Sequence, residues 1–378
     1  MKTAYKAKKI FAENEVFDNA FLIVEDGKIS SIEKNYDGEY VDYSDKYLAP
    51  GLVDTHVHGY HNIDITDGEP GSLNIMSKGV LQMGVTSFLP TTLTSSYETL
   101  NNAVKVIGEE YKQVEGAKVQ GIFMEGPFFT EEHKGAQNPA YMSDPSIEKL
   151  RHWQELSGGL IKKIAIAPER KGSVEFIKSA KKMGIYVALA HSDAGFDTAM
   201  EAVNAGANIF IHLYNGMRGL HHREPGMVGA ALYSDAYAEL ICDGHHVHPA
   251  AAGIAMKTKG HDNILLITDC MMAGGMGEGK SKLGEFDVIV KDGQARLENG
   301  SLAGSILDLI DGVKNVYDWN IADKKQAIDM ASKNAAASVG IDDKCGILKE
   351  GRDADFIVLN EDLSLVETYL DGAPVYKA

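Results

Sequence analysis

Cysteine is scarce in this chain and is not arranged for disulfide bonds. Among 378 residues there are three cysteines, Cys242, Cys270 and Cys345, and no two of them have CxxC spacing. A scattered, odd-numbered set does not form a disulfide framework. We therefore expect a reducing, cytoplasmic compartment.

Long apolar runs and an excess of positive charge are also missing. No run approaches the ~20 apolar residues that a membrane span needs, and no N-terminal apolar region precedes a cleavage site. The 37 basic residues are outnumbered by 54 acidic ones, which gives a formal net charge of −17. This balance argues against nucleic acid or an anionic membrane as a partner. A small anionic substrate is still compatible, because it needs only a local positive pocket.

The two ends of the chain both have β-rich patterns. AFLIVEDGKISSIEK is typical of a hairpin turning at Asp26-Gly27, and LSLVETYLDGAPVY of one turning at Asp371-Gly372. The middle differs, and the length allows one domain of about 250 residues plus a smaller one. We expect residues 1–49 and 346–378 to form a small β-sandwich domain, with a large domain at 50–345 inserted between them.

Short apolar runs alternate with helical patterns through the middle of the chain, as in βα units. Eight strands are expected, at 51–57, 86–92, 118–125, 161–168, 185–191, 208–214, 238–244 and 263–269. Helices are expected at 95–113, 173–183, 195–205, 249–259, 305–318 and 324–339, and a β-hairpin is expected around Asp292-Gly293. No GxGxxG follows the first strand, which weakens a nucleotide-binding interpretation. The pattern predicts an α/β fold with a (β/α)8 TIM-like barrel.

The first barrel strand ends in the sequence GLVDTHVHG, residues 51–59. Side chains two apart on a strand point to the same face, so His56 and His58 project together from its end. Two imidazoles placed in this way can share a divalent metal. A lone His-x-His is more often satisfied by local hydrogen bonds, so further ligands are needed to support a metal site.

Six side chains suited to a divalent metal fall at the ends of the predicted strands. They are His56 and His58 on the first, Glu125 on the third, His191 on the fifth, His212 near the end of the sixth, and Asp269 on the eighth. Each alone has a simpler explanation, such as a turn carboxylate, a helix N-cap or a hydrogen-bonded core histidine. Together they match the mouth of a barrel, where functional side chains gather. The donors suit Zn²⁺, Fe²⁺, Mn²⁺ or Co²⁺.

The same residues carry a family resemblance. GLVDTHVHG, HLYNGM, LITD and the β-rich ends resemble the amidohydrolase superfamily. Within it, MEGPF, HSDA, HLYNGM, REPGMVGAAL, DGHHV and LAGS resemble the N-acetylglucosamine-6-phosphate deacetylase family. The resemblance implies a (β/α)8 barrel, a β-sandwich, a homodimer, and hydrolysis of a 2-acetamido group of a phosphorylated amino sugar to give glucosamine 6-phosphate and acetate.

The resemblance also implies roles for individual residues. Glu125, His191 and His212 match ligands common to the family, while His56 and His58 match a pair that only some members have. One or two metal ions per subunit are therefore implied, with Glu125 between them. Asp269 matches the base that takes a proton from a metal-bound water and returns it to the departing amine, and it can also contact the metal.

Substrate-binding positions follow from the same resemblance. Sugar and phosphate contacts are implied for Asn215, Gly216, Arg223 and His246, and a closing loop for Leu302, Ala303 and Gly304. An arginine suits phosphate because its planar fork matches phosphate oxygens, although a lone arginine in a loop is often only a solvated charge. In the family this arginine can reach the neighbouring subunit's substrate.

One position departs from the family pattern. Gln137 stands where some members have a histidine that polarises the substrate carbonyl. Glutamine can donate a hydrogen bond but cannot carry a proton. The carbonyl is therefore activated by Gln137, by nearby His133 or by the metal.

Two other functions compete with this one. Another amidohydrolase, such as a cyclic-amide hydrolase or a deaminase, often bridges two metals with a carboxylated lysine at the end of strand four. Here that strand reads IAIAPE and has no lysine at its end. A non-catalytic barrel scaffold is expected to lack ligands or the strand-eight aspartate, and all of them are present.

Overall fold

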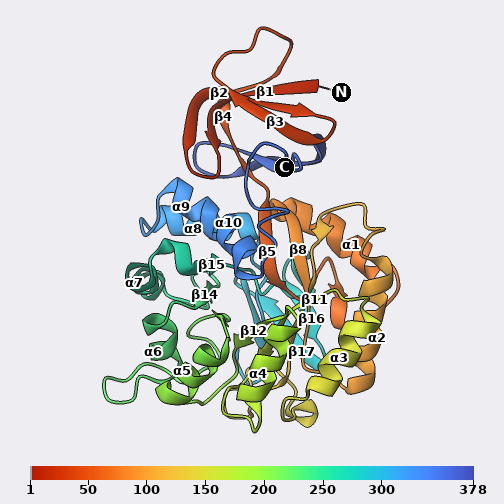
Figure 1. Ribbon diagram of the computed structural model, residues 1–378, viewed down its shortest axis with the longest axis vertical. Coiled ribbons are helices and arrows are strands. Elements are labelled where there is room, and N and C mark those ends of the chain that lie inside the picture. Colours follow the sequence, from red (N-terminus) through yellow and green to blue (C-terminus); the bar gives the residue numbers. More distant parts are fainter. Residues whose placement is uncertain (1) are drawn as a thin grey trace.

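A parallel barrel occupies the centre of the molecule in the computed structural model, which describes residues 2–378 (Figure 1). The strands pair in the order β15-β14-β13-β12-β11-β10-β8-β5, and every pairing is parallel. Their bounds are β5 (Leu52–Val57), β8 (Val85–Thr92), β10 (Ile122–Phe128), β11 (Ile161–Ile166), β12 (Tyr186–Leu189), β13 (Ile209–Phe210), β14 (Tyr237–Leu240) and β15 (Ile264–Leu266). The short β9 (Lys118–Val119) also pairs with β8 but is not part of this strand order. The predicted TIM-like barrel is confirmed.

The barrel closes through the segment that follows β15. The backbone N–H of Asp269 donates to the carbonyl oxygen of His56 at 2.9 Å. Cys270 forms a parallel bridge with Val57. The end of the eighth strand therefore lies beside the end of the first, and the functional residues of both come together.

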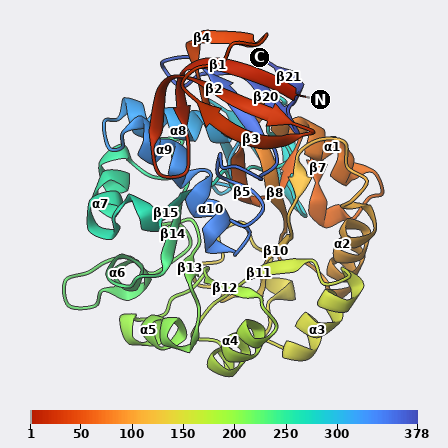
Figure 2. The ribbon, with the colours of Figure 1, turned by 45° about the horizontal axis from the view of Figure 1, so that its top comes forward.

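Helices pack around the barrel, most of them on its outside and α10 across one of its ends (Figure 2). They are α1 (Ser72–Gly79), α2 (Tyr97–Glu110), α3 (Ile147–Leu156), α4 (Ser173–Lys182), α5 (Phe196–Ala205), α6 (Gly226–Tyr233), α7 (Pro249–Lys259), α8 (Leu309–Asp318), α9 (Lys324–Met330) and α10 (Lys333–Ser338). A helix was predicted near each except α1, α3 and α6. In α6 six of the eight residues are buried, so no polar face marks it in the sequence.

Two predicted elements were too long. The helix expected at 324–339 is two helices, because Ser332 between them leaves the helical region at φ −139° and ψ −85°. The strand expected at 208–214 ends after Phe210, because His212 and Tyr214 adopt positive φ of 31° and 84°. This early end turns His212 toward the barrel mouth.

Both chain ends contribute to one seven-stranded sheet, ordered β21-β20-β19-β4-β1-β2-β3. Its strands are β1 (Lys2–Phe11), β2 (Val16–Glu25), β3 (Lys28–Glu33), β4 (Val41–Pro50), β19 (Phe356–Leu359), β20 (Leu365–Leu370) and β21 (Ala373–Lys377). The two predicted hairpins are present, since Glu25 pairs with Lys28 and Leu370 with Ala373. The sheet is consistent with the β-sandwich expected from the termini. It lies at one end of the barrel (Figure 1).

Separate apolar cores fill these layers. The largest lies between the barrel and its helices, and a second, including Val53, Phe123 and Ala165, lies inside the barrel. In the terminal sheet, Tyr5 packs edge-on against Phe356 and Tyr369 with ring centroids 5.1 and 5.4 Å away. Among the residues described, no helix has the length and apolar character to cross a membrane.

A small antiparallel sheet covers part of the barrel mouth. It contains β16 (Gly279–Leu283), β17 (Phe286–Lys291) and β18 (Gln294–Leu297), and its turn at Asp292-Gly293 is the predicted one. Its apolar side packs on Leu93 and Met271. This sheet therefore supports the loops around the site.

An ionic cluster joins the terminal sheet to the barrel, and it gives a stability prediction. Lys118 Nζ lies within 2.9 Å of carboxylates of Asp353, Asp355 and Asp371. The Asp355 side chain is 8% exposed, so Lys118→Met leaves a buried carboxylate without its cation. We expect a loss of about 2 kcal/mol in unfolding free energy, measured by urea titration.

Lys28→Met provides the matched control for this prediction. Lys28 also binds Asp353, but its side chain is 60% exposed. Its replacement is expected to cost less than about 1 kcal/mol. Equal losses for the two variants would contradict the role given to burial of Asp355.

Candidate metal centre

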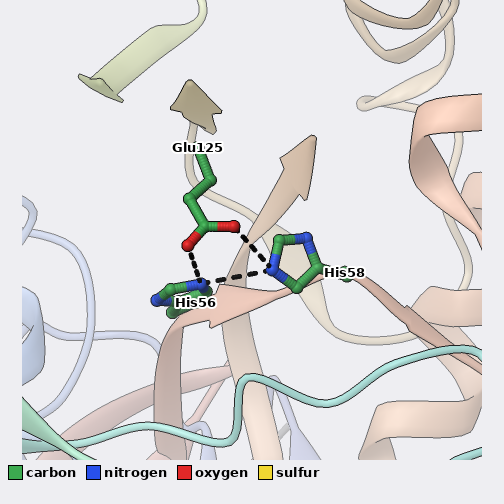
Figure 3. Close-up of side chains that lie close together, drawn as sticks. All are labelled: His56, His58 and Glu125. Atoms are coloured by element: carbon green, nitrogen blue, oxygen red, sulfur yellow. Dashed lines mark hydrogen bonds and ion pairs between the residues drawn. The ribbon is translucent and has the colours of Figure 1, made fainter. Parts of the chain in front are cut away.

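Five of the six predicted ligands form two overlapping groups at the barrel mouth. The first is His56, His58 and Glu125, whose imidazoles and carboxylate point toward one another (Figure 3). The second is Glu125, His191 and His212, and in each group the ligand atoms lie within 4.8 Å of one another. All five side chains are buried. The structure therefore brings together five of the six side chains that the strand-end argument predicted as ligands.

Each of the four histidines has its Nδ1 atom occupied by an acceptor. His56 Nδ1 lies 2.9 Å from a carboxylate oxygen of Glu239. The Nδ1 atoms of the other three lie 2.9–3.1 Å from backbone carbonyl oxygens. The partner of His58 is the carbonyl of Thr91, the partner of His191 is that of His133, and the partner of His212 is that of Asn215. An acceptor at Nδ1 fixes the N–H there and leaves the Nε2 lone pair for a ligand.

The Nε2 atoms face groups that cannot donate to them. His56 Nε2 and His58 Nε2 are 3.3 Å apart, and both rings carry their proton on Nδ1 when neutral. Two lone pairs at this distance repel unless a cation lies between or beside them. Imidazole nitrogens and carboxylate oxygens are the donors that Zn²⁺ and related ions bind in proteins. The donor set therefore fits a divalent metal.

Glu125, on β10, is shared by both groups. Its Oε1 lies 3.2 and 3.1 Å from the Nε2 atoms of His191 and His212. Its Oε2 lies 3.3 Å from His58 Nε2. Burial raises the pKa of Glu125, but the His191, His212 and His58 rings, when they are protonated in the metal-free protein, outweigh burial and hold this pKa well below its usual range. A carboxylate with one oxygen toward each group is placed to bridge two ions.

Three of the strand-end residues have strained backbones. His191, His212 and Asp269 have φ of 43°, 31° and 50°, a region that L-residues seldom adopt. Such conformations persist only where the surrounding structure enforces them, and they cluster at functional sites. Each left-handed turn ends a strand and directs its side chain inward.

Asp269 lies beside the first ligand group. Its Oδ1 is 3.0 Å from His58 Nε2 and 3.4 Å from His56 Nε2. Burial raises the pKa of Asp269, but positive charge on the neighbouring His56–His58 pair in the metal-free protein outweighs burial and lowers this pKa. At 13% its side chain is more exposed than Glu125 at 2%. Asp269 therefore contacts both the ligand cluster and the cavity.

Gln137 is held by hydrogen bonds at both ends of its amide. Its Nε2 donates to Glu125 Oε2 at 2.6 Å, and its Oε1 accepts from the backbone N–H of Thr94 at 2.9 Å. One amide N–H remains uncommitted. His133 lies farther out, where its Nε2 is 3.0 Å from Asp193 Oδ1. Of the two side chains considered for carbonyl activation, Gln137 is the one that lines the cavity.

The cavity above these ligands has a volume of about 330 Å³. Five of the predicted substrate residues line it besides Gln137, namely Asn215, Gly216, His246, Leu302 and Gly304. Gly216 has φ 59°, and a Cβ there would lie 2.8 Å from His191 Nδ1, so a larger residue would displace a ligand. His246 Nδ1 is 2.6 Å from Asp243 Oδ2, which orients its ring.

Two predicted substrate residues do not line this cavity. Ala303 is buried in the apolar core beneath the small antiparallel sheet. Arg223 is exposed in the loop before α6, with its Nη1 2.8 Å from His222 Nε2. Arg223 does not line the cavity of its own subunit. Its contact with the substrate of a neighbouring subunit in a homodimer stays a prediction.

Several residues of the site were not predicted. Leu93 and Leu283 line the apolar side of the cavity, while Glu239 and Lys163 lie beneath the ligands. The one signal in the sequence for the last two is a charged residue inside an apolar run, in IKKIAIAP and AELICDG. Charged residues are almost never fully buried unless they are paired.

The barrel and its ligand cluster together define a metal-dependent hydrolase of the TIM-barrel type. The amidohydrolase family matches residues 47–375, and the chain belongs to this family. It is 39% identical to an N-acetylglucosamine-6-phosphate deacetylase from Vibrio furnissii, over 99% of this chain and 95% of that protein.

Two further relatives have related names. The chain is 36% identical to an N-acetylgalactosamine-6-phosphate deacetylase from Escherichia coli O157:H7, over 98% of this chain and 99% of that protein. The crystal structure of an N-acetylglucosamine-6-phosphate deacetylase from Pasteurella multocida covers 100% of both chains with a TM-score of 0.94 and 29% identity. The likeness extends over the whole chain and includes the terminal sheet.

Metal binding gives the second prediction. A ligand that binds only the folded state stabilises it by about 2.7 kcal/mol at a concentration of 100 Kd. Zn²⁺ added to metal-free protein is expected to raise its Tm, and a chelator should reverse the rise. The Glu125→Ala variant removes the shared ligand and should show no rise. An unchanged Tm with Zn²⁺, Fe²⁺, Mn²⁺ and Co²⁺ would contradict the assignment of this cluster.

Proposed function

We propose that this chain hydrolyses the acetamide of N-acetyl-D-glucosamine 6-phosphate, giving D-glucosamine 6-phosphate and acetate. The observation that carries the proposal is the position of Asp269. Its carboxylate contacts His58 of the first ligand group and also lines the cavity. The names of the relatives give the substrate class. The reaction would belong to the breakdown and recycling of amino sugars.

The metal-binding part of the proposal uses residues already described. His56, His58 and Glu125 would hold one divalent ion, and Glu125, His191 and His212 a second. Zn²⁺, Fe²⁺, Mn²⁺ and Co²⁺ all suit these donors. When bound, such an ion supplies Lewis acidity toward the amide carbonyl and toward water.

Asp269 performs the proton transfers in this proposal. As a carboxylate it accepts a proton at Oδ1 or Oδ2 from the attacking water. The lowered pKa keeps it ionised before that step. The protonated acid then donates to the nitrogen of the sugar as the C–N bond breaks, so that the amine leaves without negative charge. Acetate departs as the second product and Asp269 is again a carboxylate.

The remaining residues orient the substrate. Gln137 keeps one amide N–H for the acetamide carbonyl, because its other N–H is committed to Glu125. His246, fixed by Asp243, and the backbone at Asn215 and Gly216 supply donors for sugar hydroxyls. The apolar side of the cavity, formed by Leu93 and Leu283, excludes water beside the acetyl group.

We extend the proposal to a homodimer in which Arg223 reaches the phosphate of the partner's substrate. Arg223 lies in an exposed loop before α6, outside its own cavity. Apolar side chains nearby support an interface, since Leu220 is 60% and Tyr233 76% exposed. The three cysteines are buried and unpaired, which supports a cytoplasmic location.

N-Acetylgalactosamine 6-phosphate is the second candidate substrate, because a relative with 36% identity carries that name. A cyclic-amide hydrolase with a carboxylated lysine is disfavoured by strand register. On β11 it is Ala165 that pairs with Glu125, while Lys163 pairs with Phe123 one layer below. No lysine therefore stands level with the ligands on this strand.

The substrate assignment is tested by acetate release. We expect release from N-acetylglucosamine 6-phosphate with Zn²⁺ or Co²⁺, and a kcat/KM at least about tenfold lower for N-acetylglucosamine, because charge-assisted phosphate contacts are worth about 1.5–3 kcal/mol each. The galactosamine epimer is assayed in parallel. Equal kcat/KM with and without the phosphate would contradict the phosphate contact, and no release with any of the metals would contradict the deacetylase.

The role of Asp269 is tested by Asp269→Asn. The variant should retain metal while kcat falls at least about 10²-fold, as expected for loss of a positioned acid–base group. Asp308→Asn is the matched control, because Asp308 is a hydrogen-bonded aspartate, 2.9 Å from the Tyr60 hydroxyl and outside the cavity lining. Unchanged turnover in Asp269→Asn would remove it from the proton-transfer role.

A further inference from the structure

A buried ion pair lies inside the barrel one layer below the metal ligands. Lys163 on β11 and Glu239 on β14 have side chains that are both 0% exposed, and Lys163 Nζ binds Glu239 Oε1. Lys163 Nζ also lies 3.4 Å from the carbonyl oxygen of Thr55 and 3.8 Å from the ring centroid of Phe123. The pair is fully removed from solvent.

Such a pair is not explained by stability. Taking each ion out of water carries a large free-energy cost, and well-packed apolar residues of similar volume often give a fold that is as stable or more so. The neighbouring positions inside the barrel, such as Phe123 and Ala165, are apolar. The charges at Lys163 and Glu239 therefore require a use beyond packing.

The second oxygen of Glu239 indicates that use. Glu239 Oε2 lies 2.9 Å from His56 Nδ1. An ionised carboxylate can only accept, so His56 must carry its proton on Nδ1 and direct the Nε2 lone pair toward His58 and Glu125. Phe123 holds the same ring edge-on at a centroid distance of 4.9 Å and an interplanar angle of 90°. The rotation of the ring and the position of its proton are both fixed.

Lys163 holds the other oxygen of the same carboxylate. Its Nζ binds Glu239 Oε1, while Glu239 Oε2 faces His56 Nδ1. The carboxylate cannot rotate away from His56 without breaking its contact with Lys163. The lysine thus acts on His56 through Glu239.

Among the four histidine ligands, His56 is the one whose Nδ1 faces a carboxylate. The partners of the other three are neutral backbone carbonyls. Glu239 therefore acts on the group formed by His56, His58 and Glu125, and does not touch His191 or His212. An effect confined to one of two ligand groups distinguishes a positioning role from a general role in folding.

We propose that Glu239, held by Lys163, is a positioning residue that orients His56 and thereby sets the affinity of the metal ion bound by His56, His58 and Glu125. The proposal rests on the metal-dependent function proposed above. It gives this chain an internal determinant of metal number that is separate from the ligands themselves.

Two double variants test the proposal. Glu239→Gln with Lys163→Met removes both charges but keeps an amide oxygen that can accept from His56 Nδ1. Glu239→Leu with Lys163→Met removes the charges and the acceptor. Zn²⁺ binding is measured by calorimetry on metal-free protein, with thermal unfolding to verify that both variants fold. We expect the leucine variant to bind one of two ions about 10–100-fold more weakly, the range typical for such hydrogen-bond partners of ligands. The glutamine variant should bind both ions as the native protein does.

The outcomes separate this proposal from the function on which it rests. Native protein that binds no divalent ion would overturn the metal-dependent function. Native protein and a leucine variant that both bind two ions with equal affinity would overturn only the role of Glu239.

A measurement on the native protein requires no double variant. In the ¹⁵N NMR spectrum of the Zn²⁺-loaded protein, the His56 ring should carry a slowly exchanging proton on Nδ1, with its signals assigned by their loss in His56→Gln. Ligation of His56 through Nδ1, with the proton on Nε2, would overturn the proposal even if the variants fail to fold.

Discussion

A single buried carboxylate organises the mouth of the barrel. Glu125 faces four imidazoles with its two oxygens, and its charge is removed from water. A buried charge is tolerated only when it is paired and hydrogen-bonded. The strand ends on both sides of β10 therefore have to supply compensating groups, and the surrounding backbone holds His191 and His212 at strained angles to do so. Gln137 and Thr94 complete the set.

The sequence was sufficient to predict which side chains meet at the barrel mouth, because their placement follows from two simple rules. Side chains alternate along a strand, and parallel strands end at the same edge. His56, His58, Glu125 and His212 could be placed together without coordinates for this reason. The pairing of Lys163 with Glu239 could not, because it depends on the relative stagger of β11 and β14, which are three places apart in the sheet.

The errors in the fold prediction have similar physical origins. Helix α6 was missed because it is buried on nearly all sides and lacks an amphipathic pattern. The predicted strand at 208–214 is longer than β13, which ends at Phe210. The apolar run in the sequence continues past this point, although His212 has a positive φ. The sequence shows that Gln137 departs from the family pattern. It does not show the bond from the Thr94 backbone N–H to Gln137, because these two residues are 43 positions apart along the chain.

The terminal sheet combines strands from both ends of the chain, and this affects when its strand pairing is completed during synthesis. Strand β4 pairs on one edge with β1 and on the other with β19, which begins at Phe356. During synthesis, the edge of β4 that pairs with β19 therefore stays open until nearly the whole barrel has been translated. Exposed strand edges invite pairing with other chains. The open edge of β4 is therefore a place where the nascent chain can pair with another chain before β19 is made.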